Sequence, residues 1–215
     1  MDKFKRGKER RGVRKLFDMD NPLMRILSVA ADLLLLNVLT LVCCLPVLTV
    51  GAALTAAFDV SIHMVRGEST YILKPFFRSF AANWKQATLL WLALLGIGAL
   101  LLLDYVAALN YLPALRLPVA SLGVLLLALS LYAFALLSRY ENTVPATLLN
   151  AAKLAAGFFP RTLGMVVFTL GLWLLSIQYL QYGLLILLLF GFSLPCYVSA
   201  LLLKGVFVKL EHDAA

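Results

Sequence analysis

The sequence predicts an all-α, polytopic membrane protein, a bundle of about six transmembrane helices. Of its 215 residues, 62% are hydrophobic and 14% are charged, whereas soluble domains carry roughly 25% charged residues. A soluble chain of this size cannot bury so much apolar surface, because small proteins leave a large share of their surface exposed. The apolar residues also form stretches of about 20, the length that crosses a hydrocarbon layer of ~30 Å. We therefore expect lipid to cover much of the surface.

The first 20 residues form a basic segment ahead of the apolar region. Eight of the first fifteen residues are Lys or Arg, which is typical of a cytoplasmic anchor in contact with anionic lipid. No cleavage pattern of small residues follows, so we interpret the segment as a retained anchor and not as a signal peptide. The net charge of +8 does not indicate nucleic-acid binding, because no reading motif accompanies it. Residues 21–210 are then expected to form a single transmembrane domain.

The most apolar stretch, residues 33–58, is too long for one crossing and offers one place for a turn. Pro46 cannot donate a hydrogen bond to the preceding helical turn, and it biases the residue before it away from helix. We expect a hairpin of two spans, at residues 23–45 and 47–65. The second span is rich in Ala and Gly, which favours close helix–helix contact over lipid exposure.

Two polar segments are predicted to form amphipathic helices at the cytoplasmic interface. In the first, at residues 66–85, aromatic residues recur every three to four positions between charged residues, which is typical of a helix in the membrane interface. Its candidate interface or partner-binding residues are Phe76, Phe77, Phe80, Asn83, Trp84 and Lys85. The second segment, at residues 139–161, repeats this pattern more weakly.

Four further spans are expected, at residues 87–108, 119–138, 163–181 and 183–203. The last two come from one apolar region that is too long for a single crossing, and its polar residues mark the turn. Pro195 is expected to kink the sixth span. Lys204 and Lys209 are expected to end it.

The positions of the cationic residues predict the orientation. With six spans and a cytoplasmic N-terminus, eighteen of the nineteen Lys and Arg residues fall on the cytoplasmic side, and Arg116 alone falls outside. Such a positive bias is typical of cytoplasmic segments. Five spans would place Lys204 and Lys209 outside. We therefore expect six spans with both termini in the cytoplasm.

Three polar side chains inside the spans mark a candidate intramembrane site: Asp32, Asn37 and Asp59. A carboxylate in hydrocarbon costs at least ~2.5–3.5 kcal/mol, so each must face protein or water. In an antiparallel hairpin Asp32 and Asp59 lie at the same depth, with Arg25 and His63 nearby. One hypothesis is a proton- or cation-responsive site in which His63 carries the proton. The other is a self-neutralised polar seam that only orients the hairpin.

Signatures of enzymes, metals and cofactors are absent from the sequence. It has no phosphate-binding loop, no His-Glu-x-x-His pair and no Gly-x-Ser-x-Gly motif. The three cysteines lie in apolar spans without metal-binding or redox spacing, so we interpret them as buried apolar side chains. We expect no catalytic residues, no metal and no cofactor.

Three consecutive motifs resemble the YesL-like family of bacterial integral membrane proteins, a domain of unknown function. They are Asp32-Leu followed by Asn37, then Leu45-Pro46-Val-Leu-Thr49-Val-Gly51, then Phe76-Phe-Arg-Ser-Phe80-Ala-Ala-Asn83-Trp-Lys-Gln-Ala-Thr88. The resemblance covers residues 22–95 well and the remainder mainly by the pattern of spans. It implies a bacterial cell-membrane protein without established activity, often encoded beside carbohydrate-uptake transporters and sensor kinases. Asp59 and His63 depart from the family pattern, in which an aromatic or apolar residue is expected.

Together these observations lead us to expect a non-enzymatic accessory or regulatory partner of a carbohydrate or solute uptake system. Its partners would be the anionic lipid of the cytoplasmic leaflet and, as the resemblance implies, an ABC-type sugar permease or a sensor kinase. The alternative is a small solute or proton-coupled transporter that uses the polar seam of the first hairpin. A structural role in organising lipid is a third alternative.

Overall fold

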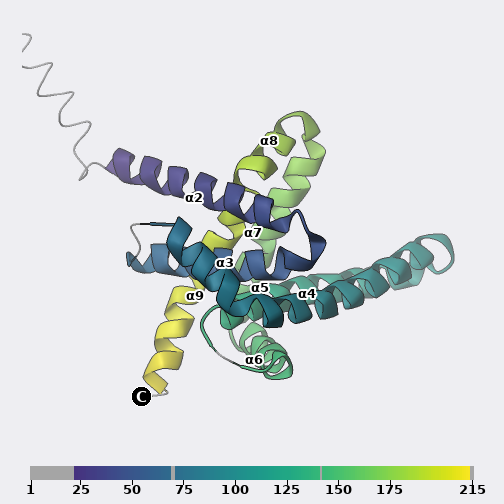
Figure 1. Cartoon of the computed structure of the whole chain (residues 1–215). Helices are drawn as coiled ribbons and strands as arrows, with labels where there is room; N and C mark the ends of the chain where they lie inside the picture. Colours follow the sequence, from purple (N-terminus) through teal and green to yellow (C-terminus); the bar gives the residue numbers. More distant parts are fainter. Residues whose placement is uncertain (1–21, 69–70, 141, 214–215) are drawn as a thin grey trace, which may run out of the picture.

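The computed structural model describes residues 22–68, 71–140 and 142–213, and the regular structure within these ranges is entirely helical. The helices are α2 (Pro22–Cys44), η1 (Val47–Thr49), α3 (Val50–Arg66), α4 (Leu73–Asn110), η2 (Pro113–Leu115), α5 (Arg116–Leu137), α6 (Val144–Gly157), α7 (Phe159–Gln178), α8 (Leu180–Phe190) and α9 (Ser193–Asp213) (Figure 1). The predicted all-α fold is confirmed. The basic segment at residues 1–20 lies outside the described residues.

Up to six segments of the described chain are long and apolar enough to cross a membrane, when the bent pair of the last two helices is counted as one span. Five of them are α2, α3, α4, α5 and α7. In two of these, the 3-10 turns η1 and η2 lead directly into α3 and α5. The sixth is the pair α8 and α9, which is bent by 59° at a short break. The predicted number of about six spans is therefore confirmed by length and composition.

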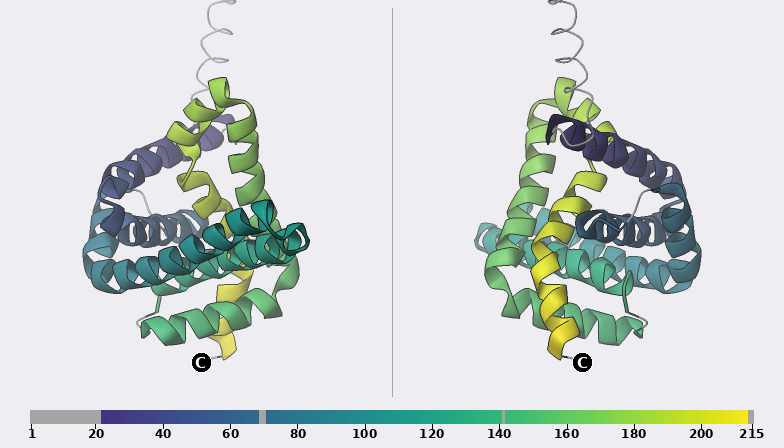
Figure 2. Two further views of the ribbon diagram at one scale, coloured as in Figure 1. Left: turned by 90° about the vertical axis from the view of Figure 1, so that its right-hand side faces the viewer. Right: turned by 90° about the vertical axis from the view of Figure 1, so that its left-hand side faces the viewer.

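The spans form three hairpins that meet around α3. The chain turns between α2 and α3, between α4 and α5, and between α7 and α8, while α9 runs back past α3 (Figures 1 and 2). α3 packs against α2, α4, α5 and α9, and ten of its 17 residues are buried. Small side chains let neighbouring backbones approach closely. The Ala- and Gly-rich second span therefore lies inside the bundle, as its composition predicted.

Gly51 allows a close approach between α3 and α4. A Cβ atom at this position would overlap the backbone of Ala87 and the Cβ atom of Trp91. The Trp91 indole N–H donates to the Val47 carbonyl at 2.9 Å, which ties α4 to the η1 turn. The Thr49 hydroxyl donates to the Cys43 carbonyl at 2.6 Å and holds the turn closed between α2 and α3.

The predicted interfacial helix and third span are one continuous helix, which corrects the boundary expected between residues 66–85 and 87–108. α4 runs for 38 residues, or about 57 Å at ~1.5 Å per residue, nearly twice the thickness of a hydrocarbon layer. No Gly or Pro separates Lys85 from Ala87, so nothing there ends the helix. Pro75 lies in the first turn of α4, where its missing N–H does no harm. The second expected interfacial helix is separate and forms α6.

The last span breaks close to Pro195, as expected. Proline cannot donate to the carbonyl four residues earlier and its ring crowds that carbonyl, which here belongs to Gly191. α8 ends at Phe190 and α9 begins at Ser193, and the Trp173 indole N–H donates to the Gly191 carbonyl at 3.4 Å. The α9 helix continues past Lys204 and Lys209 to Asp213.

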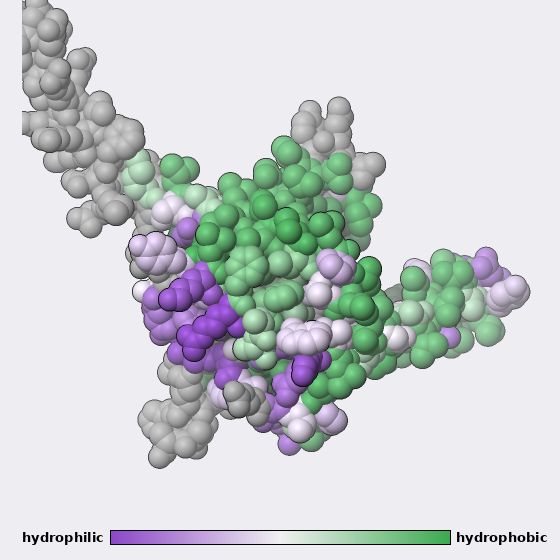
Figure 3. All heavy atoms as spheres, viewed as in Figure 1, coloured by the Kyte–Doolittle hydropathy of each residue, from purple (hydrophilic) through white to green (hydrophobic). Residues whose placement is uncertain are grey.

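Cationic residues gather at one end of the bundle. The Lys204 ammonium donates to the Val65 carbonyl at the end of α3, 3.3 Å away. The Arg139 guanidinium lies over the Phe207 ring at 5.4 Å, and Arg161 lies beside Gly205. Hydrophilic residues cover the surface where α3 ends and α4 begins, and most of the rest of that face is hydrophobic (Figure 3). We call the end of the bundle that carries Lys204, Arg139 and Arg161 the cationic end.

Candidate functional site

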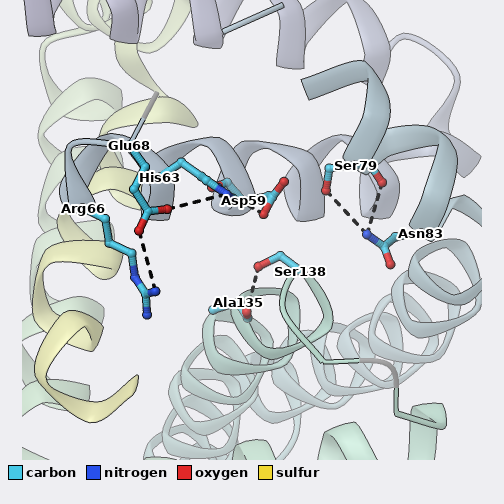
Figure 4. A network of polar contacts seen from close by, with 8 residues as sticks. All are labelled: Asp59, His63, Arg66, Glu68, Ser79, Asn83, Ala135 and Ser138. Atoms are coloured by element: carbon cyan, nitrogen blue, oxygen red, sulfur yellow. Dashed lines mark hydrogen bonds and ion pairs between the residues drawn. The ribbon is translucent and has the colours of Figure 1, made fainter. Parts of the chain in front are cut away.

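A polar cleft of about 620 Å³ opens at the cationic end, where α3 ends, α4 begins and α5 ends. Its polar lining consists of Asp59 and His63 from α3, Glu68 and Tyr71 from the segment between α3 and α4, Lys74, Arg78, Ser79 and Asn83 from α4, and Ser138 at the end of α5. A cavity of this volume is of the size that holds small ligands. We call it the polar cleft (Figure 4).

α3 contributes a carboxylate and an imidazole one helical turn apart. The His63 Nδ1 atom lies 2.8 Å from the Asp59 carbonyl oxygen and 3.4 Å from the Asp59 Oδ1 atom. The Asp59 side chain is 17% exposed and that of His63 is 41% exposed. Residues four apart share one helix face, so this pair follows directly from the sequence.

The turn after α3 brings Glu68 back toward His63. Gly67 has a φ of 75°, the left-handed conformation that commonly ends helices. The Glu68 N–H then donates to the His63 carbonyl at 3.0 Å. The Glu68 carboxylate lies 4.0 Å from the His63 Nε2 atom and 4.0 Å from the Arg66 guanidinium. His63 therefore stands between two carboxylates, one on each ring nitrogen.

α4 forms the opposite wall with two pairs of residues spaced by one turn. Lys74 and Arg78 form one pair, and Ser79 and Asn83 form the other, joined by a hydrogen bond of 3.2 Å from the Asn83 amide to the Ser79 carbonyl. The Asp59 carboxylate faces Ser79 across the cleft, and the positive charges of Arg139 and Arg78 act on it as well. Among the described residues Lys74 has no hydrogen-bond or ion-pair partner. The cleft thus holds charges of both signs.

The inner end of the polar cleft is closed by apolar side chains. Phe58 directly precedes Asp59 on α3, Leu90 lies about two turns after Asn83 on α4, and Phe134 lies about one turn before Ser138 on α5; each is at most 3% exposed. Beyond them lies an apolar hollow of about 550 Å³ between α3, α4, α5, α7 and the break before α9. Its hydroxyl groups donate to their own helices, as Thr169 does to Met165 at 2.8 Å. Of these two cavities, the polar one therefore lies at the cationic end, and the other is lined almost entirely by apolar groups.

The structure separates the members of the predicted intramembrane site. Asp59 and His63 meet in the polar cleft, whereas Asp32 is half-buried on α2 and does not line the cleft. No hydrogen bond or ion pair joins Asp32 to another described residue. The side chain of Arg25 lies outside the described part of the chain.

Asn37 lies apart from the cleft and bridges the break in the last span. Its Oδ1 atom accepts the backbone N–H groups of Phe192 at 2.8 Å and Ser193 at 3.0 Å. Its Nδ2 atom donates to the Leu188 carbonyl at 2.8 Å. The buried amide therefore hydrogen-bonds the backbone groups that the break between α8 and α9 leaves without helical partners.

The predicted aromatic stripe of α4 divides between two faces. Phe76 is fully buried and stacks with Phe80 at a ring distance of 6.4 Å. Phe77 and Trp84 are each 50% exposed on the outer face, and the Lys85 ammonium lies 5.8 Å from the Trp84 ring centre. Asn83 faces the polar cleft. One face of this segment therefore packs in the bundle and the other remains available to lipid or a partner.

Several cleft residues were not singled out from the sequence: Glu68, Lys74, Arg78, Ser79 and Ser138. The spacing of Lys74 to Arg78 and of Ser79 to Asn83 is a usable signal, because it aligns polar groups on one helix face. Asp104 was also overlooked within the third span, and it lies exposed near the far end of α4. No group of three or more potential metal-binding side chains is found among the described residues.

Five apolar helices of membrane-spanning length, six with the bent pair α8 and α9, define the class of this protein, a polytopic α-helical integral membrane protein. The family model described as "Protein of unknown function, DUF624" matches residues 33–105, which are 73 of the 215. The match runs from within α2 to within α4, overlaps the motifs that resemble YesL-like proteins, and is consistent with that resemblance. It includes Asp59, His63 and the α4 wall of the polar cleft. No curated protein and no solved structure matches the chain.

Proposed function

We propose that the chain is a non-enzymatic accessory or regulatory partner of a solute-uptake system in a bacterial cell membrane, with both termini in the cytoplasm. The proposal rests on one observation: the polar groups that line the two cavities gather at the cationic end. A protein that moves a solute by itself needs polar or hydrated surfaces along the whole crossing. Here Phe58, Leu90 and Phe134 close the polar cleft, so it supports a role in sensing or docking on one side.

The outer face of α4 supplies a surface for a partner at the same end. Phe77 and Trp84 expose half of their area, and Lys85 covers part of the Trp84 ring. Aromatic side chains beside cations suit both the membrane interface and protein contacts. The YesL-like resemblance makes a carbohydrate-uptake permease or a sensor kinase the first partner to test.

Site-specific cross-linking tests the accessory role. A photoreactive residue in place of Trp84 or Phe77, in cells of the native host, should capture a membrane permease or kinase identified by mass spectrometry. The same residue in place of Leu185, which is exposed on α8, serves as the matched control and should not capture that partner. Proteoliposomes that contain this chain alone should show no solute flux. Accumulation of solute by the chain alone would contradict the proposal.

The placement of His63 between Asp59 and Glu68 favours a second candidate function, a small proton-coupled transporter. A chain of ionisable groups is a common route for protons in transporters. In this case an imposed pH gradient should drive solute into proteoliposomes, and Asp59→Asn should abolish the uptake. Asp104→Asn, which changes an exposed carboxyl outside the cleft, should leave it unchanged. Uptake that survives Asp59→Asn would exclude a coupling role for this residue.

A further inference from the structure

We propose that the polar cleft binds a zwitterion, a molecule with a primary ammonium group and an acid group such as a phosphate or carboxylate. The ammonium occupies the inner end beside Asp59, and the acid group lies against Lys74 and Arg78. The inference does not depend on whether the protein is an accessory partner or a transporter. It rests on which atoms in the cleft remain free to bond.

The inner end of the cleft is rich in acceptors. The Asp59 carboxylate points into the space between Ser79, Asn83 and Ser138 (Figure 4). The Ser138 hydroxyl donates its hydrogen to the Ala135 carbonyl at 2.8 Å, so the lone pairs of its oxygen remain. The carboxylate oxygens of Asp59 and the hydroxyl oxygen of Ser138 are thus acceptors suited to the N–H donors of an ammonium group.

The outer wall is rich in donors. Lys74 and Arg78 lie one turn apart on α4 and both line the cleft. Neither makes an ion pair within 4 Å among the described residues, while Glu68 is engaged with Arg66 and His63. An arginine and a lysine on one face are suited to a carboxylate or phosphate. A ligand that carries only one charge satisfies only one of these two walls.

The same ligand chemistry has two sources. One is the headgroup of an ethanolamine phospholipid, which the nearby membrane supplies. The other is a soluble zwitterion such as an amino acid. The cleft volume of about 620 Å³ accepts either, because both are smaller than the ligands that such cavities usually hold.

Matched pairs of ligands that differ only in N-methylation test the proposal on the unaltered protein. Glycine is compared with glycine betaine, and glycerophosphoethanolamine with glycerophosphocholine, by calorimetry with the purified full chain. Phosphatidylethanolamine is compared with phosphatidylcholine by native mass spectrometry in nanodiscs. Methylation removes every N–H donor and keeps both charges. The methylated member of the pair that binds should bind at least about 10-fold more weakly, because hydrogen bonds to charged groups are worth about 1.5–3 kcal/mol each.

Variants then locate the binding. Asp59→Asn, Lys74→Gln and Arg78→Gln should each weaken binding by about 10-fold or more. Asp104→Asn and Lys153→Gln, which alter exposed residues outside the cleft, should stay within about twofold of the unaltered chain. If a cleft variant fails to fold, the ligand pairs on the unaltered protein still decide the question.

The outcomes separate the two sources and the failure of the proposal. Binding of glycine alone identifies a soluble ligand, and binding of the ethanolamine compounds identifies a lipid headgroup. Either result supports the proposal when methylation and the cleft variants weaken it. Equal binding of the methylated ligands, or no binding of any of these probes, would overturn the proposal. Neither of those results affects the cross-linking of a partner to α4. The ligand proposal can therefore fail while the proposed function stands.

Discussion

Asn37 and Phe192 lie 155 residues apart in the chain, and a hydrogen bond of 2.8 Å joins the side-chain oxygen of Asn37 to the backbone N–H of Phe192. The same amide accepts from Ser193 and donates to Leu188. A break in a membrane helix exposes backbone groups that lipid cannot satisfy. Asn37 on α2 therefore stabilises the bend between α8 and α9 from a neighbouring helix.

Replacing Asn37 with Leu should destabilise the protein by at least about 3 kcal/mol, because it leaves two buried donors and one acceptor unsatisfied at about 1–3 kcal/mol each. Thermal unfolding in detergent measures the effect as a lower Tm. Asn110→Leu is the matched control, since Asn110 is exposed and bonds only to Val106 in its own helix, and it should change stability by less than about 1 kcal/mol. Equal losses from the two variants would show that the bridge contributes little.

The parts of the fold that sequence predicts are those set by local chemistry. Apolar length predicts the spans, and Pro46 and Pro195 mark a turn and a break, because proline acts on the backbone beside it. The continuity of α4 was missed because Lys85 was interpreted as a boundary. Charge alone does not end a helix, and a 38-residue helix carries its polar end beyond the hydrocarbon.

The candidate site was predictable only within one helix. Asp59 and His63 are neighbours by spacing, whereas Lys74 and Arg78 reach them through packing of α4 on α3, which no local pattern records. Asp32 and Asp59 were assigned to one candidate site because both lie at one depth in the hairpin. Equal depth does not fix the direction in which each side chain points, and the structure places Asp32 outside the polar cleft.

Gly51→Ala should destabilise the protein by about 1–3 kcal/mol, the usual range for overpacking. The added methyl group meets the backbone of Ala87, which cannot rotate away as a flexible side chain can. Gly96→Ala in α4 is the control, because a Cβ atom there has no neighbour within 4 Å. That change should be neutral or stabilise by up to about 1 kcal/mol through helix propensity. Chemical unfolding in mixed micelles compares the two, and a stable Gly51→Ala variant would contradict the close approach.

Tyr132→Phe should lower stability by about 1–2 kcal/mol. The Tyr132 side chain is 1% exposed, and its hydroxyl shares a 3.0 Å hydrogen bond with that of Thr162, linking α5 to α7. Removing a buried partner generally costs about this much. Tyr105→Phe, at an exposed position on α4, should leave Tm nearly unchanged. Identical Tm values for both variants would show that Thr162 finds an equivalent partner.

The gathering of cations at one end predicts which side of the membrane each loop faces. In a variant without native cysteines, Lys153→Cys on α6 should react with a membrane-impermeant maleimide only in inside-out vesicles, because cationic segments are retained in the cytoplasm. Arg116→Cys, at the turn between α4 and α5, should react in intact spheroplasts. Both residues are exposed, so access to the reagent and not burial decides the labelling. Labelling of both positions from the same side would contradict the crossing of α5, the span that lies between Arg116 and Lys153.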